Sequence, residues 1–139
     1  MNEKQKSCAK TPEQWETVAE ILGLKDKAFI GGIESCEFSL EKLSYFLEIG
    51  FIRPKYKCNF SPTVETFYEF GKRAEAYGAS VEYIGLLESK ARDDARLLID
   101  GIKVTRFPDS VKLIMDFSQT FHEADEFTTE PELLRAWYD

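Results

Sequence analysis

The feature that most constrains the fold is a series of short apolar segments in the second half of the chain. VEYIGLLE at 81–88, ARLLI at 95–99 and IKVTR at 102–106 have the length of strands, and each is too short for a typical helix. Polar residues separate the first segment from the second, and Asp100-Gly101 separates the second from the third. The series therefore predicts a three-stranded antiparallel meander.

Asp100-Gly101 is the strongest hairpin signal in the chain, because this dipeptide is typical of a two-residue turn. Such a turn makes residues equally distant from it cross-strand partners, and cross-strand partners share one face of a sheet. One face then carries Leu97, Ile99, Ile102 and Val104, and the other carries Arg96, Leu98, Asp100, Lys103 and Thr105. We expect helices to cover only the first, apolar face.

A capping box predicts the start of the first helix. Thr11 is a good N-cap residue, Pro12 suits the first helical position, and Gln14 completes the box. Apolar residues follow at helical spacing, and Gly23 is placed to end the helix in a left-handed conformation.

Two further helices are predicted before the meander. Ser39 can cap one that ends at Gly50, and another begins after Ser61-Pro62 and stops at Gly78. Residues 24–38 contain a glycine pair that breaks regular structure, and they leave open a short helical turn or a loop.

Two more helices are predicted after the meander. Pro108-Asp109-Ser110 caps the first, and Thr129-Glu130-Pro131-Glu132 has the pattern of a second capping box that starts a short C-terminal helix. The first of these helices would turn the following residues inward: Val111, Ile114, Met115, Ser118 and Phe121.

The order of the elements predicts an α+β fold with about five helices around a three-stranded antiparallel meander (roughly 81–88, 95–99 and 102–106) that is covered on one face. We expect residues 1–10 to form a flexible N-terminal lead-in and residues 11–139 to form a single domain.

Composition agrees with one compact domain. The 139 residues are 43% hydrophobic, and a globular chain of this length buries about 68% of the surface that it exposes when unfolded. Long apolar runs are missing and the N-terminal residues are charged, so we expect neither a membrane span nor a secretory signal. Cys8, Cys36 and Cys58 are an odd number at spacings that fit no disulfide framework or zinc knuckle, which predicts free thiols in the cytoplasm.

The net charge of -7 is concentrated near the C-terminus. Residues 109–139 contain only Lys112 and Arg135 as cations, against eight carboxylate side chains. This segment should repel nucleic acid and attract a basic partner. The alternative is an acidic, solvated surface that serves solubility.

Protein binding is the function that the sequence favours. It contains neither the GxSxG motif of serine hydrolases nor a glycine-rich nucleotide motif, so we lean toward a protein without catalytic activity and expect no cofactor. The charge and the aromatic content are typical of a small acidic interaction module of the inhibitor, immunity or regulatory-subunit type, and the oligomeric state stays open. The expected contact residues are Asp116, Glu123, Asp125, Glu126 and Trp137.

A second interpretation is a nucleic-acid-associated regulator that uses residues 51–60. Arg53, Lys55 and Lys57 would contact phosphates while Tyr56 or Phe60 stacked on a base. Three cations on an acidic protein give a small electrostatic gain, so an extended solvated segment is the simpler explanation.

A third interpretation is a metal or small-molecule site at His122, the one histidine of the chain. On a continuous helix Asp125 and Glu126 would share a face with His122, and together they would supply three of the ligands of a divalent metal. Cys58 follows Lys57, whose charge could activate the thiol, although packing is the commoner role of a free cysteine.

Overall fold

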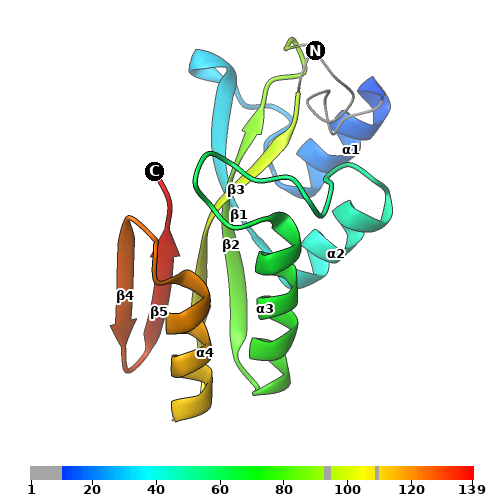
Figure 1. The fold of residues 1–139 in the computed structure, drawn as a ribbon. Helices are drawn as coiled ribbons and strands as arrows, with labels where there is room; N and C mark the ends of the chain where they lie inside the picture. The colour runs from blue at the N-terminus through cyan, green and yellow to red at the C-terminus, as the bar shows by residue number, and fades with distance from the viewer. Residues whose placement is uncertain (1–10, 93–94, 109) are drawn as a thin grey trace.

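The computed structural model describes residues 11–92, 95–108 and 110–139, and the expected lead-in at 1–10 lies outside them. Within these residues, five strands form an antiparallel sheet in the order β1-β2-β3-β5-β4, and α2, α3 and α4 lie on one side of it (Figure 1). The strands are β1 (Ile33–Ser39), β2 (Ser80–Glu88), β3 (Leu97–Thr105), β4 (Glu126–Glu130) and β5 (Leu133–Trp137). The helices are α1 (Pro12–Ile21), α2 (Leu40–Glu48), α3 (Val64–Ala76) and α4 (Val111–Phe121), with a 3-10 turn, η1 (Ile30–Gly32), before β1.

The α+β class is confirmed, and so are the first four predicted helices. Their N-caps accept hydrogen bonds from amides three residues on, as in the 3.1 Å bond from Gln14 N to Thr11 Oγ1. Ser39 and Ser110 cap α2 and α4 in the same way. The cap of α3 is Thr63, so this helix begins directly after Ser61-Pro62, as predicted.

The predicted hairpin at Asp100-Gly101 is wrong, because β3 runs straight through it. On β2, Ile84 lies opposite Gly101 and Gly85 lies opposite Ile99, so Asp100 is the extra residue of a β-bulge. The extra residue shifts the alternation of side chains by one position, so the buried residues before the bulge and those after it face the same side of the sheet. A two-residue turn would have given the same pattern of buried residues. The four side chains that were predicted to share an apolar face are indeed all buried: Leu97, Ile99, Ile102 and Val104.

The predicted C-terminal helix is also wrong. Residues 126–137 form a hairpin in which Pro131-Glu132 connects β4 to β5. β5 pairs with β3 over Gly101–Val104, which inserts it between β3 and β4. Leu134 and Ala136 are fully buried, so the period of two that a strand requires outweighs the local capping pattern.

β1 falls in the segment that the sequence left open, and it forms one edge of the sheet while β4 forms the other. η1 precedes it, so residues 24–38 contain both a short helical turn and a strand. Five strands and four α-helices in the described residues replace the three strands and five helices expected.

The stripe that α4 buries agrees with the predicted one at Phe121 and differs from it elsewhere. Leu113, Phe117 and Phe121 are fully buried, whereas Val111 is 69% exposed and Met115 is 54% exposed. The stripe that faces the sheet is therefore i, i+4, i+8 from Leu113, and both sides of this helix carry apolar residues.

A tyrosine fixes α3 on the sheet. Tyr83 Oη of β2 donates a 2.8 Å hydrogen bond to Phe67 O in α3. One turn further along α3, a Cβ on Gly71 would lie 2.1 Å from Tyr83 Oη, so any larger residue here would displace the helix or the tyrosine ring. The same contact buries the phenol and raises the pKa of Tyr83 far above its usual value.

Candidate binding face of the sheet

The face of the sheet that points away from the helices is the most distinctive surface of the described chain. Side chains alternate along a strand, and Val81 and Tyr83 of β2 are buried under the helices. Glu82, Ile84 and Leu86 therefore point to the opposite side, where each is at least partly exposed. We call this side the open face.

A shallow hollow of about 450 Å³ lies on the open face. Residues of four strands line it: Ser35, Cys36, Glu37, Ile84, Lys103 and Arg135. Gly101, opposite Ile84, adds no side chain here, and a Cβ at this position would lie 2.9 Å from Ala136 O. The close approach of β3 and β5 thus requires glycine, and the missing side chain leaves a depression at the centre of the open face.

Two ion pairs cross the open face. Lys103 of β3 contacts the carboxylate of Glu37 on β1, and Arg135 Nη1 of β5 lies 2.8 Å from Glu126 Oε1 on β4. The cations are 29% exposed at the side chain and their partners are more exposed. Such partly solvated pairs contribute little to stability, about 0–1 kcal/mol each.

Trp137 lies on the same face, and its ring is held in place. Trp137 Nε1 donates a 3.2 Å hydrogen bond to Asp100 Oδ2, the carboxylate that the β-bulge adds to β3. Asp100 is 7% exposed, and its second oxygen, Oδ1, is buried without a hydrogen-bond partner. Burial raises the pKa of Asp100, while the bond from Trp137 acts in the opposite direction.

The structure brings two of the five predicted contact residues together. Glu126 lies directly opposite Trp137 in the β4–β5 pairing, so both side chains are on the open face. Asp125 accepts a 2.7 Å hydrogen bond from Asp139 N at the turn before β4, and Glu123 is exposed near the end of α4. Asp116 lies in the helical layer instead.

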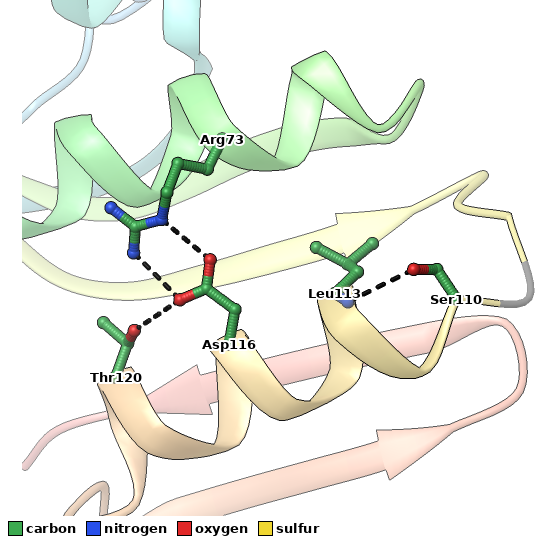
Figure 2. Close-up of polar contacts among 5 residues, drawn as sticks. All are labelled: Arg73, Ser110, Leu113, Asp116 and Thr120. Atoms are coloured by element: carbon green, nitrogen blue, oxygen red, sulfur yellow. Dashed lines mark hydrogen bonds and ion pairs between the residues drawn. The ribbon is translucent and has the colours of Figure 1, made fainter.

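Asp116 is occupied by an ion pair between two helices. Figure 2 shows the Arg73 guanidinium of α3 reaching Asp116 of α4 through two bonds, Nε to Oδ2 at 2.7 Å and Nη2 to Oδ1 at 3.0 Å. Thr120 Oγ1 donates a further 3.1 Å bond to Oδ1. The bond from Arg73 is the main reason that the pKa of Asp116 is lowered. Asp116 thus joins α3 to α4.

Some side chains of the basic segment, residues 51–60, also make contacts within the protein. Lys55 Nζ lies 2.8 Å from Glu65 Oε2, and the guanidinium of Arg96 lies 5.4 Å from the centre of the Tyr56 ring. Arg53 and Lys57 are exposed. Since Arg96 covers the ring of Tyr56, Phe60 is the aromatic side chain of this segment that is available for contacts, with an exposure of 88%.

The helical spacing on which the metal interpretation depended is not present. α4 ends at Phe121, His122 is its C-cap, and Glu126 begins β4. His122 Nδ1 lies 3.0 Å from Gln119 O. In residues 11–92, 95–108 and 110–139 no cluster of three metal-ligating side chains occurs.

The two cysteines in the described part of the chain are free thiols, and Cys8 lies outside it. Burial raises the pKa of Cys58, and the charge of Asp100 acts in the same direction. Burial likewise raises the pKa of Cys36, at the hollow, to about 12. Neither environment favours a reactive thiolate near neutral pH.

The sequence pattern predicts Lys103 on the polar side of the meander and Trp137 and Glu126 among the contact residues. The pattern does not identify Glu37 and Arg135, because β1 pairs with β2 and β5 pairs with β3 across long stretches of sequence. Ile84 lies in a predicted strand, but the pattern does not assign the faces of that strand. Alternation within 133–137 was the one signal that could have placed Arg135 beside Trp137 on this face.

Searches with models of protein families, among curated proteins and among solved structures find no match for this chain. The helices of the described residues are all too short or too polar to cross a membrane.

Proposed function

We propose that this chain is a non-enzymatic protein-binding module and that the open face of its sheet contacts the partner. The observation that carries the proposal is the combination, on one uncovered face, of a fixed tryptophan, a hollow and two partly solvated ion pairs. We propose a module of the inhibitor, immunity or regulatory-subunit type. The free thiols Cys36 and Cys58 fit a reducing compartment, and we propose the cytoplasm.

Trp137 supports this proposal because of how its ring is held. Tryptophan is enriched among the residues that dominate binding energy at protein interfaces. Its bond to Asp100 fixes the indole before any partner arrives, which reduces the conformational entropy lost on binding. Ile84 and Leu86, both partly exposed on the same face, add apolar area around the hollow.

The charges of the open face favour a basic partner. Besides the buried Asp100, four exposed carboxylates and two partly exposed cations lie on this face: Glu37, Glu82, Glu126, Glu130, Lys103 and Arg135. The cations lie on the inner strands β3 and β5, and three of the carboxylates lie on the edge strands β1 and β4. A partner with Lys or Arg toward the rim and carboxylates toward the centre would match this pattern.

The test replaces a partly exposed side chain of the open face and an exposed side chain of the helical layer. Ile84→Glu places a charge beside the hollow, and Val111→Glu places the same charge on an exposed position of α4 as the matched control. Both variants are checked for folding by circular dichroism and thermal unfolding. Purified protein is then used for affinity enrichment from its native source, with quantitative mass spectrometry.

We expect wild type and Val111→Glu to retain the same stoichiometric protein and Ile84→Glu to lose most of it. Equal retention by both variants would exclude the open face as the contact surface. The absence of any stoichiometric protein with wild type would reject the binding module itself.

A further inference from the structure

The connection between α2 and α3 differs in charge from the rest of this acidic protein. Residues 49–64 contain no carboxylate side chain, and Arg53, Lys55 and Lys57 are all exposed. Phe60, in the same connection, is 88% exposed. The connection therefore presents one exposed aromatic ring and three exposed cations, of which Lys55 is paired with Glu65 at the start of α3.

A locked turn holds Phe60 in this position. Ser61 N donates to Cys58 O at 2.9 Å, which closes a four-residue turn with Asn59 and Phe60 at its centre. Ser61 Oγ, which is buried, accepts from Cys58 N at 3.0 Å and donates to Pro62 O at 3.0 Å. Asn59 has φ 51, a left-handed conformation that asparagine tolerates better than most residues.

The turn is also tied to the body of the protein. Val64 N donates to Tyr56 O at 2.8 Å, and Glu65 N donates to Pro54 O at 2.8 Å, so two further bonds close the connection behind the turn. The Tyr56 ring packs against the Arg96 guanidinium, beside the start of β3. Figure 1 shows the connection crossing in front of β3 before it enters α3.

We propose that the Cys58–Ser61 turn is a preorganised anchor that inserts Phe60 into an apolar pocket of a protein partner whose rim carries carboxylates. The inference rests on the proposed binding function and adds a second surface, with the opposite charge preference to the open face. A ring on a fixed turn loses little conformational entropy on insertion. Arg53, Lys55 and Lys57 would meet the acidic rim.

A protein pocket is a better match for this turn than a single-stranded nucleic acid. Proteins that bind single strands stack successive bases on several aromatic rings along a cationic groove. Here Arg96 covers the ring of Tyr56, which leaves Phe60 as the ring of the connection that protrudes. One protruding ring fits one concave pocket.

The test places the photocrosslinking residue p-benzoylphenylalanine at position 60 of the full chain, in an extract of the native source. The same residue at position 115, where Met115 is 54% exposed on α4, is the matched control. A third protein carries the probe at position 60 together with Arg53→Gln, Lys55→Gln and Lys57→Gln. Each extract is irradiated with and without nuclease treatment.

We expect one dominant crosslinked polypeptide from position 60, its absence from position 115, and at least a tenfold loss of yield when the three cations are neutralised. With that polypeptide purified, Phe60→Ala should weaken binding by roughly 30-fold, the effect of removing a central aromatic anchor. Binding of the wild type should weaken as salt increases.

Equal crosslinking at both positions, no crosslink, a nuclease-sensitive nucleic-acid adduct, or less than a twofold effect of Phe60→Ala would each overturn the proposal. If the turn fails while Ile84→Glu still loses a partner, the anchor alone is rejected. If neither surface binds a protein, the proposed function fails with it.

Discussion

Two carboxylates are buried in neighbouring strands of the sheet, and their surroundings differ. Glu88, at the end of β2, is 3% exposed and contacts Arg96 Nε at 2.5 Å and Arg92 Nη2 at 3.1 Å. Asp100, at the bulge of β3, is 7% exposed and receives one side-chain hydrogen bond, from the neutral indole of Trp137. Burial alone therefore does not determine whether a carboxylate stabilises the folded protein, because the groups that compensate its charge also matter. Glu88 has two arginines as partners, and Asp100 has a neutral indole.

The difference follows from where each residue lies in the chain. Arg92 and Arg96 follow Glu88 within eight residues, so the connection between β2 and β3 itself supplies the cations. Asp100 is the extra residue of the bulge, and its position is dictated by the pairing of β3 with β2. Removing charge should therefore destabilise the protein at Glu88 and stabilise it at Asp100.

The largest effect is expected for Glu88→Gln. The substitution removes the charge that compensates Arg96, whose side chain is 25% exposed, and we expect a loss of about 3 kcal/mol in the free energy of unfolding. Urea denaturation measures it. Glu82→Gln, on the same strand but exposed, is the control and should change the stability by less than about 0.5 kcal/mol. Equal effects of the two substitutions would show that the arginine pairs contribute nothing specific.

The second-largest change in stability is expected when Asp100 loses the hydrogen bond from the indole of Trp137. Trp137→Phe keeps an aromatic ring but leaves both carboxylate oxygens without a side-chain donor, which should cost about 2 kcal/mol. Urea denaturation of this variant is compared with that of the double variant Trp137→Phe, Asp100→Asn. The second substitution should recover part of the loss, and strictly additive effects would argue against coupling through the hydrogen bond.

The third effect has the opposite sign. Asp100→Asn removes a buried charge, keeps an acceptor for Trp137, and should stabilise the protein by about 1 kcal/mol at pH 7. Because burial raises the folded-state pKa of Asp100, the wild type has its full stability from this group below the unfolded pKa, about 3.9, and loses it as pH rises through the folded pKa. The advantage of the variant should therefore vanish at acidic pH, as measured by thermal unfolding between pH 3 and 7. An advantage that persists unchanged at pH 3 would contradict this explanation.

Helix ends could be predicted from the sequence because their contacts are local. Thr11, Ser39 and Ser110 each bond an amide three residues away, so the cap and its partner lie within one window of the sequence. The stripe of α4 could not be placed in the same way. Apolar residues occupy two sides of that helix, and contacts with the sheet decide that Phe117 rather than Met115 is buried.

The sheet could be predicted only in part, since its pairing is distant in the sequence. A turn and a bulge at Asp100-Gly101 give the same alternation of apolar residues, so the pattern identified the buried face but not the path of the chain. The choice of strand over helix at 133–137 depends on the pairing of β5 with β3, about thirty residues away in the sequence. The open face combines residues of strands on both sides of that pairing, which is why its hollow was not foreseen.

The smallest effect is expected at a partly exposed carboxylate, Asp116, that has two side-chain partners. Asp116, 26% exposed at the side chain, is paired with Arg73, 47% exposed, and Asp116→Asn should destabilise the protein by about 0.5 kcal/mol at pH 7 (Figure 2). Arg73 lowers the pKa of Asp116, so the stabilisation is present above the unfolded pKa and is lost as pH falls through the folded pKa. At low pH the greater stability of wild type relative to Asp116→Asn should disappear, and so should its lower stability relative to Asp100→Asn. Thermal unfolding of both variants across one pH series tests the two signs together. A loss at Asp116→Asn as large as at Glu88→Gln would mean that solvent exposure does not set the strength of these pairs.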